Sequence, residues 1–310
     1  MSNPKFDQVV LKRFENLDLL AKQVVEGFIT GLHKSPFHGF SVEFAEHKIY
    51  NPGESTRHID WKLYARSEKL FVKRFEEETN LRCQIIIDNS SSMYFPSYDD
   101  KSKLNKVEFS ALSAAALIYL MKKQRDAVGL SLFSEKIEQH YRARSNSVHQ
   151  KLLFAQLANL LKSENRSLNK LTATANSLHL LAETIHKRSL IVLFSDMFVN
   201  SGNPDDVFSA LKHLKHNKHE VILFHVYDKD KELDLNFKNR PIRFVDMETG
   251  KNIRLNPSSV KEKYKNSLSE YFKQLKLKCL QYRIEFVEAD INEGFEKILL
   301  SFLIKRARLF

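Results

Sequence analysis

Three short stretches of this chain carry residue types that could do chemistry together. A D-x-S-x-S motif at residues 88–92 directly ends the apolar run CQIIID, and Ser195 and Asp196 directly follow the apolar run LIVLF. Between them, Thr172 and Thr174 stand just ahead of a helical pattern. Short apolar runs of this kind are typical of parallel strands buried on both faces. Sites in such sheets form outside the carboxyl ends of the strands, so these polar residues are the first candidates for a functional site.

The candidate residues share one chemistry, because their oxygens are hard ligands. In D-x-S-x-S the alternate side chains can converge on one point while the loop turns. The carboxylates of Asp88 and Asp196, with the hydroxyls of Ser90, Ser92 and a threonine, would suit Mg²⁺, Mn²⁺ or Ca²⁺ and would suit zinc poorly. Mg²⁺ retains waters in octahedral geometry, so a carboxylate from a partner protein could fill an open position. The sequence predicts a divalent-cation site, with Mg²⁺ as the first candidate.

The same motif also has a plainer interpretation. Asp88, Ser90 and Ser92 could cap a helix or accept hydrogen bonds from turn amides, as such residues often do. For the motif in isolation we would prefer that interpretation. Its place directly after a buried strand, together with an isolated Asp196 after another buried strand, favours the metal site.

The elements that must position these residues alternate in type from residue 81 onward. Strand patterns and helical patterns follow one another to the C-terminus, and this alternation predicts a doubly wound, mostly parallel α/β sheet flanked by helices, with right-handed crossovers. The strand patterns lie at residues 83–88, 127–133, 136–142, 190–194, 221–227 and 283–287. The helical patterns lie at residues 103–123, 148–162, 177–186, 207–216 and 260–280 and from about residue 294, and a hairpin is expected at 241–254.

The first 80 residues have a different texture. A helical pattern over about residues 6–32 is followed by a polar, aromatic stretch rich in turn residues. We therefore expect an N-terminal helix-plus-strand extension over residues 1–80 and an α/β domain over residues 81–310.

Composition excludes several function classes. Only 8 of the 310 residues are glycine, and neither G-x-G-x-x-G nor G-x-x-x-x-G-K-[ST] occurs, so the usual glycine-rich phosphate cradles are absent. The formal charge is +11, but the first 80 residues are balanced and the excess is spread over the remainder. A diffuse excess of this kind does not predict a specific nucleic-acid function.

Sequence features also bear on the compartment. The start of the chain lacks a basic segment followed by an apolar one, and the longest apolar run without charge, Phe109 to Met121, has 13 residues. That run is too short to span a bilayer. Cys83 and Cys279 lie far apart and match no disulfide framework or metal spacing. We expect a cytoplasmic protein with no membrane insertion and with reduced core thiols.

The candidate residues resemble a von Willebrand factor A-type domain with a metal-ion-dependent adhesion site. Asp88, Ser90 and Ser92 match its D-x-S-x-S, and Asp196 matches its later aspartate. The third-loop ligand matches best at Thr172, with Thr174 as the alternative. The glycines usual near that threonine are missing here.

Short sequence blocks between residues 33 and 66 point to one particular family. From about residue 30 onward the chain is similar to the bacterial family called domain-of-unknown-function fifty-eight, which is similar to A-domain proteins encoded beside MoxR-type AAA+ ATPases. The resemblance implies an adaptor or co-chaperone without catalytic activity, acting with a MoxR-type ATPase on an unknown client protein. The blocks that carry it are His33-Lys34-Ser35, Gly39 to Phe44, Tyr50 to Glu54, Arg57 to Lys62 and Ala65-Arg66.

Two alternatives remain at this point. The block at residues 50–66 could be a docking surface for the ATPase, or a structural clamp in which Trp61 is a buried anchor. The strand-end site could instead serve a metal-assisted hydrolase or phosphatase with Asp88 as nucleophile. Against the hydrolase, the sequence places no phosphate-binding lysine or glycine loop beside the motif.

Overall fold

The chain divides into two compact units in a computed structural model. One unit contains the start of the first helix, up to Phe28, and the described residues from Leu81 onward; the other runs from Ile29 to Asn80. The start of the first helix thus groups with the sheet, whereas we expected residues 1–80 to form one extension. The structure describes residues 17–32, 47–49, 61–67, 69–73, 81–96, 104–162, 174–197, 204–247 and 249–307.

The described residues of the smaller unit include a short antiparallel pair of strands and a helix. Strand β1 (His47–Ile49) pairs with β2 (Phe71–Lys73), and α2 (Trp61–Ser67) lies between them in sequence. Trp61 is 63% exposed, and its ring meets that of Tyr64 edge-on at 6.2 Å between centroids. The clamp interpretation expected Trp61 to be a buried anchor, and in the structure it is exposed.

The larger unit is built on a six-stranded sheet with the order β10-β7-β6-β3-β4-β5. Neighbouring strands are parallel except for β4 and β5, which are antiparallel. The predicted doubly wound, mostly parallel sheet is thus confirmed. The strands are β3 (Arg82–Asp88), β4 (Ala127–Phe133), β5 (Ile137–Arg144), β6 (Leu190–Ser195), β7 (Glu220–Tyr227) and β10 (Glu285–Asp290).

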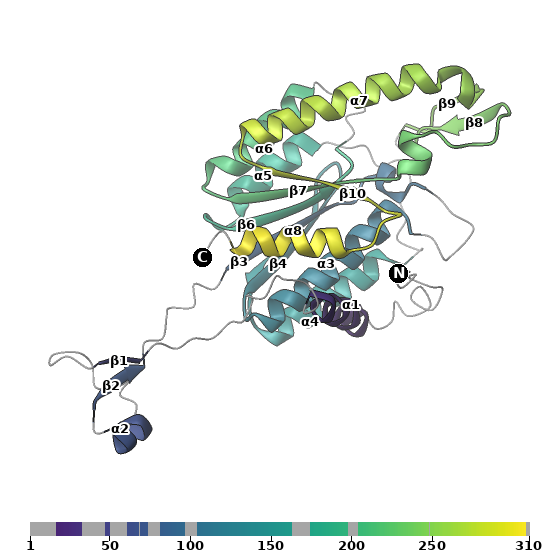
Figure 1. The fold of residues 1–310 in the computed structure, drawn as a ribbon. Coiled ribbons are helices and arrows are strands. Elements are labelled where there is room, and N and C mark those ends of the chain that lie inside the picture. Colours follow the sequence, from purple (N-terminus) through teal and green to yellow (C-terminus); the bar gives the residue numbers. More distant parts are fainter. Residues whose placement is uncertain are drawn as a thin grey trace. The chain divides into compact units, whose positions relative to one another are not determined.

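Helices cover both faces of this sheet (Figure 1). Helices α5, α6 and α7 lie on one face, and α1, α3, α4 and α8 lie on the other. Central strands buried on both faces in this way are continuous apolar runs, as the sequence indicated. The helices are α1 (Leu17–Leu32), α3 (Lys106–Lys123), α4 (Ser147–Leu160), α5 (Thr174–Thr184), α6 (Pro204–His216), α7 (Pro257–Gln281) and α8 (Glu296–Ala307).

Helix α3 is the most deeply buried of the crossover helices because it is apolar nearly all round. Its Phe109 ring stacks on Phe295 at 5.0 Å between centroids. Its start is fixed by a capping box, in which Asn105 Oδ1 accepts from Glu108 N at 2.8 Å and Glu108 Oε2 accepts from Asn105 N at 3.0 Å. The capping box makes Lys106 the first residue of the helix.

The chain reverses its direction of winding between β3 and β6. After β3 it crosses by α3 to β4 on one side, whereas β6, β7 and β10 continue on the other. The carboxyl ends of β3 and β6 therefore flank the topological switch point, where α/β sheets form their sites.

The connection between β7 and α7 carries extra structure. A short π-type helix, η5 (Lys229–Leu233), follows β7. The hairpin of β8 (Ile242–Val245) and β9 (Asn252–Leu255) then forms where the sequence predicted one.

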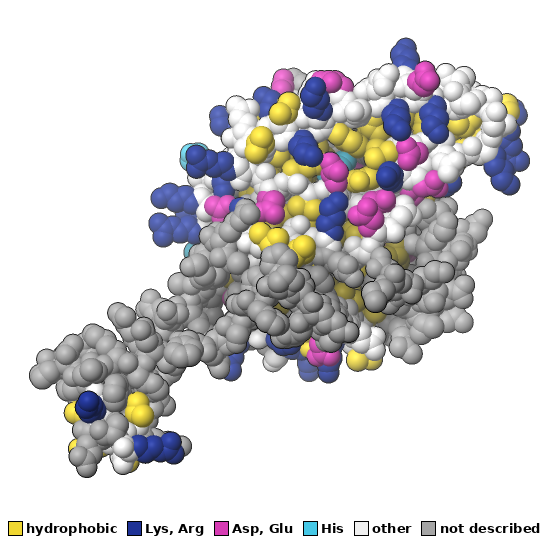
Figure 2. Space-filling model, in the orientation of Figure 1, with side chains coloured by type: hydrophobic (Ala, Val, Ile, Leu, Met, Phe, Trp, Pro, Cys, Tyr) yellow, Lys and Arg dark blue, Asp and Glu magenta, His cyan; other side chains and the backbone are white. Residues whose placement is uncertain are grey.

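The surface mixes both signs of charge. Figure 2 shows basic and acidic side chains interspersed over the face that includes α7. Cys83 and Cys279 are buried free thiols, as expected. Among the described residues, no helix combines the length and the apolar character needed to cross a bilayer.

Gly129 provides a test of how tightly β4 packs against β5. The pairing shifts register at Gly129, and a Cβ built there would lie 2.5 Å from Tyr141 O and 2.7 Å from Ala143 N, both of which are backbone atoms. We predict that Gly129→Ala lowers the free energy of unfolding by about 2 kcal/mol or more, since rigid backbone must move. Denaturant unfolding measures this effect.

Gly294 supplies the matched control. Apart from its chain neighbours, no atom of the described residues lies within 4 Å of a Cβ built at Gly294. Gly294→Ala should therefore leave stability unchanged or raise it slightly. Equal losses in the two variants would contradict the packing argument.

Candidate functional site

The candidate site begins where β3 and β6 end side by side. Ile87 pairs with Phe194 across the two strands, so the next residues, Asp88 and Ser195, are neighbours on the same face of the sheet. Ser195 Oγ donates to Asp88 Oδ2 at 2.7 Å and accepts from Met197 N at 2.9 Å. Ser195 thus links the first motif to the loop that carries Asp196.

The D-x-S-x-S loop turns back over the end of β3. Asp88 Oδ1 accepts from Ser90 N at 2.9 Å, and the chain enters a short 3-10 helix over Ser91–Tyr94. The hydroxyls of Ser90 and Ser92 lie 3.1 Å apart. The alternate side chains of the motif therefore do lie together, with Asp88 and Ser90 buried and Ser92 half-buried.

The plainer capping interpretation explains part of this geometry. Asp88 does satisfy the turn amide of Ser90, as that interpretation expects. However, Ser90 precedes the 3-10 helix without making a side-chain capping hydrogen bond. Capping therefore accounts for one carboxylate oxygen of Asp88 and leaves the paired serine hydroxyls unexplained.

Asn89 holds the loop in place from its other side. Its side chain donates to Glu138 Oε2 at 2.8 Å and accepts from the Tyr94 hydroxyl at 2.7 Å, while its backbone N–H donates to Phe133 O at 2.7 Å. Ser134 Oγ also donates to Glu138, at 2.7 Å. These contacts fix the loop on β4 and β5, so the motif rests on rigid elements.

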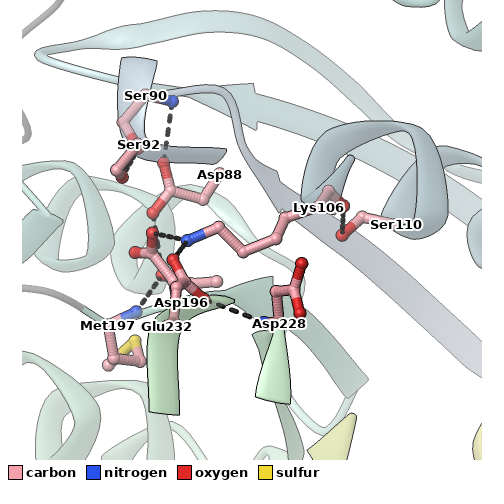
Figure 3. Close-up of polar contacts among 10 residues, drawn as sticks. Asp88, Ser90, Ser92, Lys106, Ser110, Asp196, Met197, Asp228 and Glu232 are labelled. Atoms are coloured by element: carbon pink, nitrogen blue, oxygen red, sulfur yellow. Dashed lines mark hydrogen bonds and ion pairs between the residues drawn. The ribbon is translucent and has the colours of Figure 1, made fainter. Parts of the chain in front are cut away.

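Asp196 is paired with a lysine that the sequence interpretation did not place here. Lys106 Nζ donates to Asp196 Oδ2 at 2.8 Å and to Glu232 Oε1 at 2.5 Å (Figure 3). The exposed fractions of the side chains of Lys106, Asp196 and Glu232 are 0%, 1% and 11%. The expectation of no lysine beside the motif is therefore wrong, because the start of α3 brings Lys106 to this edge of the sheet.

The electrostatics of the site show a surplus of negative charge. Burial and the nearby Asp196 together raise the pKa of Asp88 to about 7, although hydrogen bonds from Ser195 and Ser90 lower it. Burial also raises the pKa of Glu232, while Lys106 lowers it. Two buried carboxylates, Asp88 and Asp196, and the partly buried Glu232 thus meet one ammonium among these four groups, an arrangement that a further cation would stabilise.

The donor set fits a hard cation better than a soft one. Within the described part of the chain, no three histidine, cysteine or acidic side chains are grouped so as to hold an ion. An ion here would depend on hydroxyl oxygens as well as carboxylates, as the sequence predicted for Asp88, Ser90, Ser92 and Asp196. Such oxygen ligands suit Mg²⁺, Mn²⁺ or Ca²⁺.

The predicted third-loop ligand cannot be placed. Thr172 lies outside the described residues. The alternative, Thr174, begins α5, which packs against α6. The assignment of this ligand stays a prediction.

Sequence reasoning also missed His225. This residue lies opposite Ser195 across β6 and β7, is 1% exposed, and has no hydrogen-bond partner for either ring nitrogen among the described residues. Its ring meets Phe272 edge-on at 4.4 Å and stacks on Phe286 at 5.7 Å. Burial lowers the pKa of His225 to about 4, with Asp196 opposing the shift and Lys106 adding to it. An imidazole in such surroundings stays neutral.

Of the residues that complete the site, Ser195 was already a candidate, and the others differ in the signals that the sequence carried. Ser195 directly follows a buried run and stands beside the predicted Asp196. Lys106 is a basic residue at the start of a helix, where the helix dipole disfavours a positive charge. Glu232 had no such signal, because only the tertiary fold brings it to Lys106.

The switch-point location and the strand-end residues define a von Willebrand factor A-like domain. A sequence profile described as "Protein of unknown function DUF58" matches residues 46–272, and the chain belongs to this family. The resemblance seen in the sequence is thus confirmed. Uncharacterized proteins of Mycobacterium tuberculosis and Mycobacterium bovis are 23% identical over 230 residues, which cover 73% of this chain and 68% of each relative.

Solved structures with similar folds have low sequence identity to this chain. The conserved hypothetical protein BatB from Bacteroides thetaiotaomicron is 14% identical to this chain, with a TM-score of 0.46. The match covers 74% of this chain and 99% of the BatB chain. The VWA domain of SpRpn10 is 12% identical with a TM-score of 0.40, covering 70% and 92%.

The buried His225 predicts a pH dependence of stability. The pKa of His225 is lower in the folded protein than in the unfolded chain, so between about pH 6.5 and pH 4 the imidazole is protonated only in the unfolded chain. The free energy of unfolding therefore falls as the pH drops through this range. His225→Phe should remove this part of the slope. Relative to the parent, the variant should gain about 2 kcal/mol between pH 7.5 and pH 5.

Denaturant unfolding at several pH values measures this difference. His216 is exposed on α6, so His216→Phe serves as the control and should keep the parent's slope. Parallel slopes for the parent and His225→Phe would contradict the assignment of a buried neutral imidazole.

Proposed function

We propose that this protein is a non-enzymatic, metal-dependent protein-binding module. A divalent cation, with Mg²⁺ as the first candidate and Mn²⁺ or Ca²⁺ as alternatives, would be held by Asp88, Ser90, Ser92 and Asp196. Thr172 is the proposed ligand from the third loop. The observation that carries the proposal is the surplus of buried carboxylates beside paired serine hydroxyls at the switch point.

The bound ion would supply a coordination position for a carboxylate of another protein. The chain's own residues orient the ligands: Ser195 holds Asp88, and Lys106 holds Asp196. In the described residues around these ligands, the hydrogen bonds include no nucleophile paired with a histidine base, since the nearby His225 is without a partner. This arrangement supports binding in preference to catalysis.

We further propose that the partner is a MoxR-type AAA+ ATPase and that the chain acts as its adaptor or co-chaperone toward a client protein. The support is the family resemblance, together with the scarcity of glycine, which removes the usual nucleotide cradles from this chain. The exposed Trp61 and Tyr64 of α2 supply an aromatic surface of the kind that dominates interface energetics.

A metal-assisted hydrolase or phosphatase is the second candidate function, and Lys106 is the observation that favours it. A lysine beside a metal is a common arrangement in phosphoryl transfer. Lys106, however, is fully buried and is engaged by two carboxylates. Its ammonium therefore pairs with carboxylates of the protein and is not available to a phosphate group, so the binding module remains the preferred function.

The metal site can be tested with an isosteric variant. We predict that Asp88→Asn weakens binding of Mg²⁺ or Mn²⁺ by about tenfold or more, since it removes a carboxylate ligand. Thermal unfolding in EDTA should occur at or above the parent's temperature, because the variant also removes repulsion between Asp88 and Asp196. Calorimetric titration with each ion measures the affinity.

Asp126 provides the matched control. It is also a buried aspartate, 2% exposed, and it accepts from Leu81 N at the other end of β3 and β4. Asp126→Asn should bind the ion like the parent. Equal affinities in Asp88→Asn and the parent would overturn the site, and phosphoester turnover lost in Asp88→Asn would favour the hydrolase.

The partner proposal can be tested by capture of a purified MoxR-type AAA+ ATPase. We predict that Trp61→Ala reduces capture by about fivefold or more without changing ion affinity or unfolding temperature, because Trp61 is exposed. The Ser90→Ala variant should capture less ATPase than the unmodified protein, and EDTA should reduce capture by the unmodified protein. Leu280→Ala, which alters a side chain on α7 that is 73% exposed, is the control for nonspecific apolar contact. Capture that is insensitive to all of these changes would contradict the proposal.

A further inference from the structure

Lys106 has a position that local chemistry disfavours. It is the first residue of α3, where the helix dipole opposes a positive charge, and its side chain is fully buried. Lysines are seldom buried unless they are paired. The pairing with Asp196 and Glu232 must therefore offset both costs.

The ammonium is built to remain charged. Burial by itself would lower the pKa of Lys106, but Asp196 and Glu232 outweigh burial and raise it above the ordinary value. Its distances of 2.8 Å to Asp196 Oδ2 and 2.5 Å to Glu232 Oε1 are those of charge-assisted hydrogen bonds. The site thus contains a permanent cation that is tethered to α3.

The Glu232 end of this pair reaches a second segment. Glu232 Oε2 accepts from Asp228 N at 2.8 Å, which closes η5 onto the end of β7. Asp228 Oδ1 accepts from Asp230 N at 2.9 Å and from Asn292 Nδ2 at 3.0 Å. Lys106 therefore joins the loop after β6 to the segment Asp228–Leu233 after β7.

We propose that Lys106 is a resident cation that shares Asp196 with the divalent ion, and so both limits the affinity for that ion and couples its binding to the segment Asp228–Leu233. The inference rests on the proposed metal site and concerns its regulation. When the ion binds Asp196, two positive charges meet at one carboxylate. Repulsion moves the ammonium toward Glu232, and the hydrogen bonds around η5 respond.

Charge-balanced variants separate this role from simple structural support. Lys106→Met alone would leave Glu232 buried without its ammonium, which is strongly destabilising. The double variant Lys106→Met/Glu232→Gln removes one charge of each sign, so that Glu232 is not left as an unpaired charge and only Asp196 loses its ammonium. It frees Asp196 from the ammonium, so Mn²⁺ affinity should rise by about tenfold or more. In Glu232→Gln alone, Asp196 is the remaining carboxylate partner of Lys106 in this pair of contacts. The ammonium then competes more strongly with the ion for Asp196, and Mn²⁺ affinity should fall by a similar factor.

The experiment measures Mn²⁺ affinity by calorimetry and electron paramagnetic resonance, and amide hydrogen exchange over residues 228–234. In the parent, Mn²⁺ should change the exchange rate of this segment by about tenfold, and in the double variant it should leave the rate unchanged. Lys215→Met/Glu220→Gln is the control, because this pair, 2.8 Å apart, includes the first residue of β7, at the opposite end of the strand. It should behave like the parent in both measurements.

The outcomes distinguish this inference from the proposed function. If the parent and the double variant bind Mn²⁺ equally, the role of Lys106 is overturned while the metal site stands. If only the double variant binds, the role of Lys106 is supported and a metal-dependent function of the parent fails. If neither binds, both proposals are overturned.

Discussion

The buried ammonium of Lys106 is the interaction on which the arrangement of this edge of the sheet depends. It lies where the ends of β6 and β7 meet the start of α3, and it joins carboxylates that come from two different connections. Without this charge, Asp196 and Glu232 would be buried carboxylates beside Asp88, with no cation among these groups to offset their repulsion. The capping box at Asn105 and Glu108 has a role beyond helix stability, since it fixes the residue that carries the charge.

Most of the sheet could be predicted from the sequence because its central strands are buried on both faces. Strands β3, β4, β6 and β7 are apolar runs whose observed ends differ from the predicted ones by at most one residue. The edge strand β10 was less exact, predicted at residues 283–287 and found at Glu285–Asp290. Its residues EFVEAD are only partly buried, so polarity obscured its end, and Arg283, with φ 56°, belongs to the turn after α7. Local pattern is informative where burial is uniform and is weaker at an edge.

The grouping of the candidate residues could be predicted in part for a related reason. Asp88, Ser90, Ser92 and Asp196 directly follow buried strands, and topology alone brings strand ends together. Lys106 is 90 positions from Asp196 and 126 positions from Glu232 in the sequence, and no spacing rule links these residues. His225 was read as part of an apolar run, and only the burial of both its ring nitrogens shows it to be unusual. Sequence therefore predicts the ligands better than the charges that balance them.

The balance of positive and negative charge at this edge of the sheet determines which chemical groups can approach it. Among the described groups at this edge, three carboxylates and one ammonium disfavour the approach of phosphate and carboxylate groups alike. If the proposed function holds, a bound cation would have to offset this charge before an acidic side chain of another protein could approach, and the divalent ion would be a condition for binding. The same surplus weakens the hydrolase alternative, because a phosphoester would meet this repulsion, and Lys106 already donates to two carboxylates. The contact that we propose would therefore exist only while an ion is bound.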